Sequence, residues 1–338
     1  MELNVWTSTN IKDTPTFDPK THSWTVHLQR ADGTERIVHP RHVILASGHS
    51  GEPRIPMFPG AETFKGDIHH SARHISGAKY RGKRAVIVGS CNSGHDIAAD
   101  FYEHGAESVT MIQRSSTYVI SQRAVTQRVM GQLYSEDGPP TEDADLFFTS
   151  IPYPVLKTIQ QHVTQLVAED DKEMLSGLEK AGFKADYGYE GSGLFMKYLI
   201  SGGGYYIDVG CSQMIVDGKI KIKQGKEIAK IVADGVVFED GSKLEADVIV
   251  LATGYANMRE TARKIFGDKL ADSVSDVWGF NEEGEIAIMW QSNDLWIAVL
   301  MIESGHEGFW FMGGNLGLAR VYSRFLALQI KAIELGLQ

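Results

Sequence analysis

Short stretches of alternating apolar and polar residues open the chain, which is the pattern of half-buried β-strands. Residues 3–7 (LNVWT) and 23–29 (SWTVHLQ) follow it, and the turn signal ADGT then precedes ERIVH and RHVILASGH, which ends at residue 49. The pattern predicts a strand, a hairpin and a final buried strand.

A similar series returns late in the chain. Residues 234–255 read DGVVFEDGSKLEADVIVLATGY, again a strand, a DG turn, a second strand and a buried strand. The two series end alike, in VILASGH at residues 43–49 and VIVLATGY at residues 248–255. We interpret them as two copies of one supersecondary unit.

The later copy follows a βαβ pattern that the earlier copy lacks. Residues 85–96 (AVIVGSCNSGHD) read as a buried strand, a glycine turn and the start of a helix that stops at Gly105. Further strands are predicted at residues 108–114 and 219–223. The matching βαβ half of the earlier copy would lie before Met1. We therefore expect open strand edges in the first unit, covered by another chain or by a rebuilt fold.

Residues 118–205 depart from the βαβ pattern. The apolar residues there recur at helical spacing, which predicts a mostly helical insertion in the second unit; they are Val155, Ile159, Val163, Leu166 and Val167. The insertion could carry substrate contacts or be a plain helical cap on the sheet. Near the C-terminus, residues 308–338 predict a buried strand, a glycine pair and an amphipathic helix that begins near Gly314 and Asn315.

Composition and charge narrow the class of protein. A chain of 338 residues is long enough for about two domains, and its net charge of −10 argues against non-specific binding to nucleic acids or anionic membranes. The N-terminus has no signal-peptide pattern, and the apolar run at residues 295–302 is far shorter than the ~20 residues that span a bilayer. Two cysteines provide no disulfide framework, so we expect a cytoplasmic protein.

The glycine loop, residues 89–94, is the strongest candidate site. Gly89 permits a tight turn and Gly94 permits close helix–strand packing, as in loops that hold a dinucleotide phosphate. Cys91 replaces the middle glycine, whose usual role is to let the backbone approach the pyrophosphate. We predict that the loop binds the cofactor through Gly89, Ser90, Cys91, Asn92, Ser93 and Gly94. The alternative is a βαβ unit that binds nothing.

Other residues refine this hypothesis. Arg114, followed by Ser115 and Ser116, suits the 2′-phosphate of NADPH better than the 2′-hydroxyl of NAD, although a solvated surface arginine is the plainer interpretation. Cys91 lies at a helix N-terminus, where a reactive thiolate is possible, but a small residue that fills a turn is the favoured reading. His69, His70 and His74 lack matching ligand spacing, so ordinary hydrogen bonding is expected rather than a metal site. No catalytic residue is identified.

Together these motifs resemble the flavin-containing monooxygenases and their Baeyer–Villiger relatives. The segment from GEPRIPMFPG to FKGDIHHSARH is similar to their FxGxxxHxxx(Y/F/W) signature: Phe64, Gly66 and His70 match, and His74 stands at the usual aromatic position. GSCNSGHDIA resembles the NADPH loop of the fungal members, which carry the cysteine, and LATGY resembles a later linker motif. The resemblance implies FAD on a first Rossmann domain and NADPH on a second, with the flavin oxygenating an amine, a sulfide or a ketone.

The resemblance also implies a fold: a tandem Rossmann-like α/β flavoprotein whose first domain is incomplete and whose second carries a helical insertion. The expected domains are a remnant of the FAD-type domain, a crossing segment, the NADPH domain and the C-terminal part of the FAD-type domain, at residues 1–48, 49–82, 83–252 and 253–338. Gly254 and Tyr255 would lie at the domain crossing, and Gly314 and Asn315 near the flavin. The family's first glycine fingerprint has no counterpart in this sequence, which makes FAD binding by this chain doubtful.

The expected function is NADPH-dependent oxygenation of a small molecule, in fungal secondary metabolism. Two alternatives stay open: a flavin-free cyclase, isomerase or dehydratase on the same fold, and an inactive NADPH-binding remnant. A homo-oligomer or a partner chain could cover the incomplete domain. Relatives pass quickly from a tryptophan like Trp290 to the C-terminal strand, so the intervening residues 291–303 are read as an added strand or an interface patch.

Overall fold

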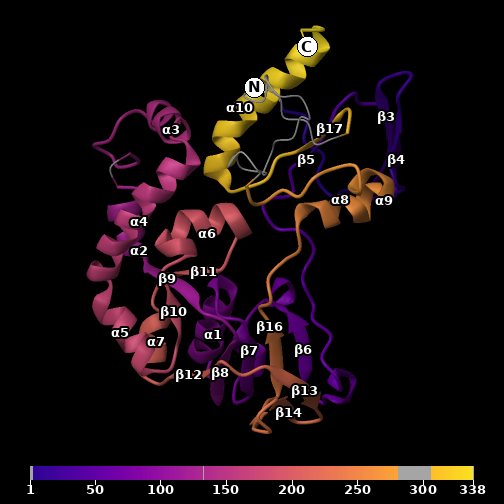
Figure 1. Cartoon of the computed structure of the whole chain (residues 1–338). Coiled ribbons are helices and arrows are strands. Elements are labelled where there is room, and N and C mark those ends of the chain that lie inside the picture. Colours follow the sequence, from indigo (N-terminus) through magenta and orange to yellow (C-terminus); the bar gives the residue numbers. More distant parts are fainter. Residues whose placement is uncertain (1–2, 132, 281–305, 338) are drawn as a thin grey trace. The chain divides into compact units, whose positions relative to one another are not determined.

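The computed structural model describes residues 3–131, 133–280 and 306–337. The segment 291–303, read above as an added strand or interface patch, lies outside the described residues. The chain divides into two units: unit 1 comprises Met1–Glu52 and Tyr255–Gln338, and unit 2 comprises Pro53–Gly254. Figure 1 labels their helices and strands along the chain.

Unit 2 is built on a parallel sheet with the strand order β12-β8-β7-β16-β6. Its strands are β6 (Asp67–His70), β7 (Arg84–Val88), β8 (Ser108–Gln113), β12 (Ile220–Gln224) and β16 (Val248–Leu251). β7 and β16 are almost continuously apolar, and β8 is buried from Val109 to Gln113, as expected for parallel strands covered on both faces. The strands predicted at 85–88, 108–114, 219–223 and 248–251 are thus present.

The two faces of this sheet have different covers. Alternate residues such as Ile87 and Val250 pack under helices α1 (Asn92–Glu103), α5 (Lys172–Lys180) and α7 (Cys211–Val216). Their neighbours, such as Val86 and Ile249, pack under an antiparallel sheet of β13 (Ile228–Val232), β14 (Gly235–Phe238) and β15 (Lys243–Glu245). The period-two alternation of β7 and β16 therefore divides their side chains between two cores.

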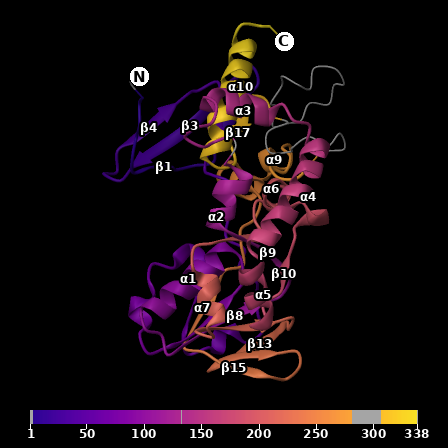
Figure 2. The ribbon, with the colours of Figure 1, turned by 90° about the vertical axis from the view of Figure 1, so that its left-hand side faces the viewer.

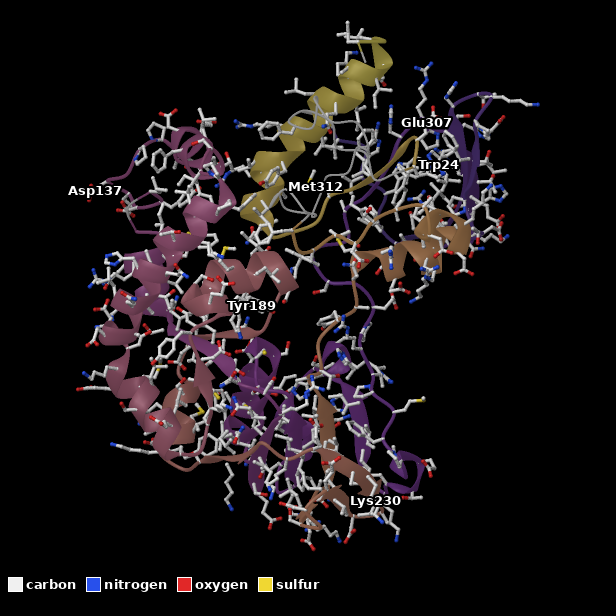
Figure 3. All side chains as sticks on the ribbon, in the orientation of Figure 1. Trp24, Asp137, Tyr189, Lys230, Glu307 and Met312 are labelled. Atoms are coloured by element: carbon white, nitrogen blue, oxygen red, sulfur yellow. The ribbon has the colours of Figure 1, made fainter. Side chains whose placement is uncertain are left out.

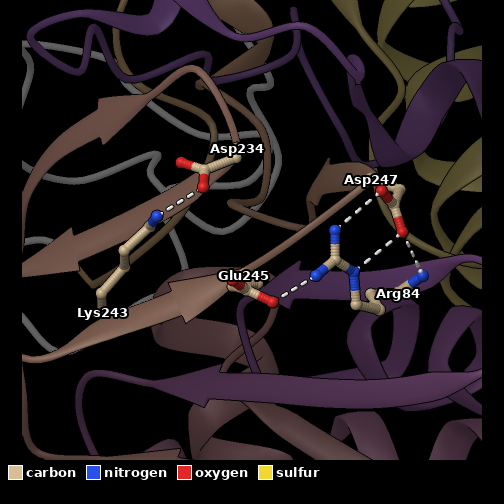
Figure 4. Close-up of polar contacts among 5 residues, drawn as sticks. All are labelled: Arg84, Asp234, Lys243, Glu245 and Asp247. Carbon is tan, nitrogen blue, oxygen red and sulfur yellow. Dashed lines mark hydrogen bonds and ion pairs between the residues drawn. The ribbon is translucent and has the colours of Figure 1, made fainter.

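A charged clamp joins the first residue of β7 to the residue that precedes β16. Arg84 donates to Asp247 from its backbone N–H at 2.9 Å and from two guanidinium nitrogens at 3.0 Å, and it also bonds Glu245 (Figure 4). The Arg84 guanidinium lowers the pKa of Asp247 to about 2. This bidentate contact ties the start of β16 to the start of β7.

The segment predicted as a helical insertion contains both helices and a second sheet. Its helices are α2 (Gln122–Ala124), the π-helical turn η4 (Val125–Val129), α3 (Thr141–Thr149), α4 (Tyr153–Asp170), α5 and α6 (Gly193–Ser201). Its strands β9 (Thr117–Ser121), β10 (Ala185–Asp186) and β11 (Tyr205–Asp208) form a parallel sheet in the order β10-β9-β11, which the periodicity did not predict.

The inward face of α4 also differs from the expectation. The prediction placed Val155 and Ile159 on the buried stripe, but these side chains are 51% and 42% exposed, whereas Gln160 and Thr164 are buried. Thr164 makes a side-chain hydrogen bond with the hydroxyl of Tyr118. Burial raises the pKa of this tyrosine. The buried face of α4 therefore combines the apolar Leu156 and Val167 with polar side chains, one of which meets Tyr118 on β9. The remaining turns of unit 2 are η1 (Ala61–Thr63), η2 (Ser71–Arg73), η3 (Gly77–Tyr80) and η5 (Tyr189–Gly191).

Unit 1 begins with an antiparallel sheet, visible in Figure 2, in which β3 pairs with three other strands. These are β1 (Thr9–Ile11), β2 (Thr16–Asp18), β3 (Ser23–Arg30) and β4 (Glu35–Val38). The predicted strand at residues 3–7 is wrong: this stretch has no regular structure, and Leu3 and Val5 are more than 70% exposed. The ADGT hairpin between β3 and β4 is confirmed.

The core of unit 1 is aromatic. Trp24, labelled in Figure 3, is 1% exposed, contacts the rings of Phe17, Phe266 and Phe309, and donates its indole N–H to the carbonyl of Gly308 at 3.0 Å. Helices α8 (Met258–Phe266) and α9 (Asp268–Ala271) belong to this unit. These ring contacts connect the N-terminal sheet to the C-terminal part of the chain.

The C-terminal strand and helix appear where the sequence predicts them. β17 (Phe309–Phe311) pairs in parallel with β5 (Val43–Leu45), and α10 (Leu316–Glu334) follows the glycine pair. Among the described residues, no helix is long and apolar enough to cross a membrane. The described part of unit 1 therefore contains a two-stranded parallel pair where unit 2 has five parallel strands.

Candidate functional site

The glycine loop joins the end of β7 to the first turn of α1. Gly89 has φ +123°, and a Cβ there would lie 2.2 Å from the carbonyl oxygen of Ala252, just after β16. A Cβ at Gly94 would lie 2.3 Å from the carbonyl oxygen of Gly89. Only glycine fits either position without a shift of backbone. The loop is therefore pressed between α1 and the end of β16.

The N-terminus of α1 is open to an anion. Cys91 is the N-cap residue and makes no side-chain hydrogen bond to the first turn. The first intrahelical bond runs from the His95 N–H to the Cys91 carbonyl at 3.1 Å. The N–H groups before it point out of the helix, where the helix dipole favours negative charge. This is the usual arrangement for binding a phosphate.

Cys91 faces the interior of the unit. Its sulfur lies near Thr117, the backbone of Gly204 and the ammonium of Lys197, and burial raises its pKa. The effect of burial outweighs the helix N-terminus and Lys197, which both favour a thiolate. The thiol is therefore protonated at neutral pH, and its geometry matches a small side chain that fills a turn.

The segment after β8 lies at the same edge of the sheet. Val88 and Ile112 are register partners, so the loops that follow β7 and β8 emerge side by side. Arg114 and Ser115 are exposed and Ser116 is partly exposed, and Arg114 has no hydrogen bond or ion pair with any described residue. Gln113, by contrast, is fully buried and bonds the backbone of Lys184 in both directions, at 2.7 and 2.9 Å. Arg114 is thus available to a ligand and Gln113 is structural.

The same edge includes the point at which the strand order reverses. β8 and β12 lie on one side of β7, and β16 and β6 lie on the other. Ligands of open α/β sheets bind outside the carboxyl ends of strands at such a point. Gly254, after β16, accepts hydrogen bonds from His70 Nε2 at 3.0 Å and from the Arg54 N–H at 2.9 Å. His70 Nδ1 accepts from Ala72, so Nε2 carries the proton.

The predicted site residues do not all fall in one unit. The glycine loop, Arg114 to Ser116, and Gly254 belong to unit 2, whereas Tyr255, Gly314 and Asn315 belong to unit 1. Gly314 has φ +88°, and Asn315 caps α10 by accepting from the Leu318 N–H at 3.0 Å. Asn315 thus has a structural role at the start of α10.

His69 and His74 take part in a hydrogen-bonded chain. His69 Nε2 lies 3.4 Å from His74 Nδ1, and His74 Nε2 lies 2.7 Å from Asp100 on α1. Burial lowers the pKa of His69. Within the described ranges, no group of three or more histidine, cysteine or carboxylate side chains is arranged to hold a metal ion. These hydrogen bonds connect the segment after β6 to helix α1.

Sequence reasoning missed one residue beside the glycine loop. His95 is fully buried, stacks on Tyr206 with ring centroids 3.7 Å apart, and its Nδ1 lies 3.2 Å from the Cys91 carbonyl. Burial lowers its pKa to about 4. The signal was present in the sequence, since His95, Ala98 and Phe101 recur every three residues on one helical face. His95 is therefore a neutral core side chain that braces the loop carbonyl.

Comparisons with known proteins agree with this architecture. A family model for flavin-binding monooxygenase-like proteins matches residues 6–261. The probable indole-3-pyruvate monooxygenase YUCCA10 of Arabidopsis thaliana is 29% identical over 241 residues, which is 71% of this chain and 55% of the relative. Dimethylaniline monooxygenase [N-oxide-forming] 2 of Rattus norvegicus is 29% identical over 73% of this chain and 41% of the relative. The chain spans about half the length of these relatives.

Solved structures share the fold. A crystal structure of cyclohexanone monooxygenase with bound epsilon-caprolactone has a TM-score of 0.60 and 16% identity, covering 97% of this chain and 68% of that one. A steroid monooxygenase bound to NADP has a TM-score of 0.52 and 20% identity, covering 76% and 54%. Because the family model covers most of the chain, the chain belongs to the flavin-binding monooxygenase-like family.

Proposed function

We propose that this member of the flavin-binding monooxygenase-like family binds NADPH at the glycine loop of unit 2 and serves the NADPH-dependent oxygenation of a small molecule. The observation that carries the proposal is the conjunction of three features at one sheet edge: the tight Gly89 turn, the open N-terminus of α1 and the unpaired Arg114. Each suits one part of a dinucleotide phosphate. The family match favours this function over a flavin-free pathway enzyme.

The described residues fit NADPH in the following way. Gly89 allows the tight turn and Gly94 the close packing that place the first turn of α1 at the end of β7, and the first-turn N–H groups of α1 donate to the pyrophosphate. Arg114 pairs with the 2′-phosphate, with Ser115 and Ser116 as hydroxyl partners. Bound NADPH would supply the hydride that reduces FAD. Gly254, held by His70, fixes the end of β16 beside the loop.

The substrate class follows from relatives and stays a proposal. The names of the similar proteins include a keto acid, an aromatic amine, a cyclic ketone and a steroid. We propose an amine, a sulfide or a ketone as the substrate of this chain. A cytoplasmic role in fungal secondary metabolism stays a prediction from the sequence.

FAD fits the described residues of unit 1 only in part. They contain one strand-to-helix turn, at Gly313–Asn315 between β17 and α10, and a parallel pair in which Ile44 is 44% exposed. We propose that this FAD-type unit is incomplete, and that a second chain could supply the other strand, turn and helix. Loss of two or three charge-assisted hydrogen bonds, each about 1.5–3 kcal/mol, would weaken FAD binding by about 10³-fold or more.

The NADPH assignment is tested by Arg114→Ala in calorimetric titrations with NADPH and NADH. A charge-assisted contact of about 1.5–3 kcal/mol predicts that the NADPH Kd rises about 10- to 100-fold while the NADH Kd stays the same. Arg123→Ala, which removes an exposed arginine that bonds the carbonyl of Asp170, is the matched control. Equal weakening of both nucleotides, or no change, would contradict the 2′-phosphate contact.

The incompleteness of the FAD-type unit has its own test. We expect purified protein to show no flavin absorbance after gel filtration and to bind added FAD more weakly than NADPH. A single chain that retains stoichiometric FAD through the column would overturn the proposal for unit 1 and leave the NADPH assignment standing.

A further inference from the structure

Three consecutive side chains of the glycine loop turn toward the small sheet β10-β9-β11. Ser90 Oγ and Thr117 Oγ1 on β9 share a hydrogen bond of 2.8 Å. Asn92 Oδ1 accepts from the Ile207 N–H on β11 at 3.0 Å. The Cys91 sulfur, between them, faces Thr117 and the backbone of Gly204. We call this contact zone the seam; it comprises Ser90, Cys91, Asn92, Thr117, Gly204 and Ile207.

Thr117 is the centre of the seam. It is 1% exposed and Ser90 is 7% exposed, so their bond is shielded from water. On its other side, Thr117 Oγ1 accepts from Gln113 Nε2 at 3.4 Å. Because the amide of Gln113 can only donate there, the Thr117 hydroxyl is free to donate to Ser90. One hydroxyl thus connects the end of β8, the small sheet and the glycine loop.

The direction of Cys91 explains why a side chain is tolerated at the middle position. A glycine usually stands there so that the backbone can approach the pyrophosphate. The Cys91 side chain is partly buried, and its sulfur contacts Thr117 and Gly204 in the seam, while it makes no hydrogen bond to the first turn of α1. Replacing it by glycine would remove packing from the seam and add backbone freedom to the loop.

We propose that Thr117 is a positioning residue for the nucleotide, and that the seam, rather than a middle glycine, sets the shape of the phosphate-binding loop. This inference rests on the proposed NADPH site and deepens it. The small sheet β10-β9-β11 then acts on the cofactor without touching it, by holding Ser90 and Asn92. A variant of the seam therefore alters the binding of both NADPH and NADH, which share the pyrophosphate.

Two substitutions separate positioning from simple packing. Thr117→Val keeps the volume and leaves Gln113 bonded to Lys184, but it removes the buried partner of Ser90, which predicts an NADPH Kd about tenfold higher. Thr117→Ser keeps the hydroxyl and should stay within about twofold of the original protein. Cys91→Gly, which restores the usual glycine, should weaken NADPH binding about fivefold rather than strengthen it.

The experiment is a calorimetric titration of the full chain and these variants with NADPH and NADH, with melting temperatures recorded alongside. Cys211→Ala, which truncates the buried cysteine of the helix-side core, is the control and should lower the melting temperature without changing either Kd. The expected result is weaker binding in Thr117→Val, rescue in Thr117→Ser, and an unchanged ratio of the two Kd values.

Each other outcome decides against the inference. Unchanged affinity in Thr117→Val, equal loss in both Thr117 variants, or tighter binding in Cys91→Gly would overturn the role of the seam and leave the NADPH site intact. If Thr117→Val does not fold, Cys91→Gly carries the test. Original protein that binds no NADPH would overturn both the seam and the proposed function.

Discussion

The two copies of the repeated strand motif have nearly the same sequence and different surroundings. β16, in VIVLATGY, has β7 and β6 as parallel neighbours, and its residues are 0–3% exposed. β5, in VILASGH, pairs among the described residues with β17 alone, and Ile44 is 44% exposed. Ile44 corresponds to Val250, which is fully buried. Neighbouring strands, not the motif, therefore decide how much each copy contributes to a core.

The same difference applies to the ends of the two strands. In unit 2, Ala252 after β16 packs against Gly89, at the sheet edge where we propose that the nucleotide binds. In unit 1, Gly48 after β5 has no atom within 4 Å of a would-be Cβ. An end of a parallel strand becomes a binding site where adjacent strands bring further loops to it.

The largest contrast is expected between Gly89→Ala and Gly48→Ala. Both glycines have positive φ, but only the Gly89 Cβ would meet a backbone atom, at 2.2 Å. We expect Gly89→Ala to lower the free energy of unfolding by about 4 kcal/mol and to abolish NADPH binding, and Gly48→Ala to cost about 1 kcal/mol.

Urea unfolding followed by two signals can assign these losses to a unit. All six tryptophans lie in unit 1, so their fluorescence follows that unit, whereas far-UV circular dichroism follows both. If Gly89→Ala and Gly48→Ala lowered the free energy of unfolding equally, the close approach of Ala252 to Gly89 would not contribute to stability.

Acid should weaken unit 2 through His95. The pKa of His95 in the folded protein is about 4, below the ordinary value of 6.5. Between these two pH values, His95 is protonated in the unfolded chain but stays neutral in the folded one. Stability present above pH 6.5 is therefore lost as the pH falls toward 4, by about 3 kcal/mol in total. Urea unfolding at pH 7 and 4.5 should show this loss in circular dichroism.

His95→Phe, which keeps the stacking on Tyr206, should be less stable at pH 7 and should show a much smaller pH dependence. The histidines of unit 1 with lowered pKa values, His42 and His49, are only partly buried, so the tryptophan signal should change less. The same pH dependence in His95→Phe and in the original protein would exclude His95 as its source.

A matched pair of truncations tests the burial contrast directly. Val250→Ala should cost about 2 kcal/mol, because it leaves a void in a closed core, whereas Ile44→Ala should cost less than about 1 kcal/mol. Denaturant midpoints by circular dichroism and tryptophan fluorescence provide the measurement. If Ile44→Ala were as costly as Val250→Ala, β5 would be covered in solution, and the contrast between the two strands would be wrong.

The smallest effect is expected at the clamp in Figure 4. Because Arg84 lowers the pKa of Asp247 to about 2, this carboxylate stabilises the fold above pH 4, and the contribution is lost as the pH falls from about 4 to 2. Both side chains are about 30% exposed, so Asp247→Asn should cost only about 1 kcal/mol at neutral pH.

Asp234→Asn removes the more exposed Lys243 pair in the same figure and is the control, with almost no expected change. The difference between Asp247→Asn and the original protein should shrink below pH 4. A difference that stays constant with pH would mean that the carboxylate charge is not what stabilises the clamp.

The repeat, the glycine loop and the parallel strands could be predicted because their signals are local. Parallel strands that are buried on both faces have continuous apolar runs rather than alternating apolar and polar residues. The runs that end before Gly89 and Thr253 are of this kind, so they predict β7 and β16. The small sheet could not be predicted, because β9 and β11 have five and four residues and are separated by more than eighty others.

The site was predictable in part. The positions of Gly89, Gly94 and Arg114 follow from the βαβ pattern, whereas the partners of Ser90 and Asn92 lie on strands far along the chain. The inward position of Thr164 on α4 likewise involves the hydroxyl of Tyr118, a contact that apolar periodicity does not predict.

The central claim is that the nucleotide binds at the completed sheet of unit 2 and not at the shorter copy in unit 1. Hydrogen–deuterium exchange of the full chain with and without saturating NADPH tests it most directly. The account predicts slower exchange in residues 89–95 and 113–117, with no change in residues 43–49 and 309–316. Protection confined to residues 43–49 and 309–316, or protection nowhere, would contradict it.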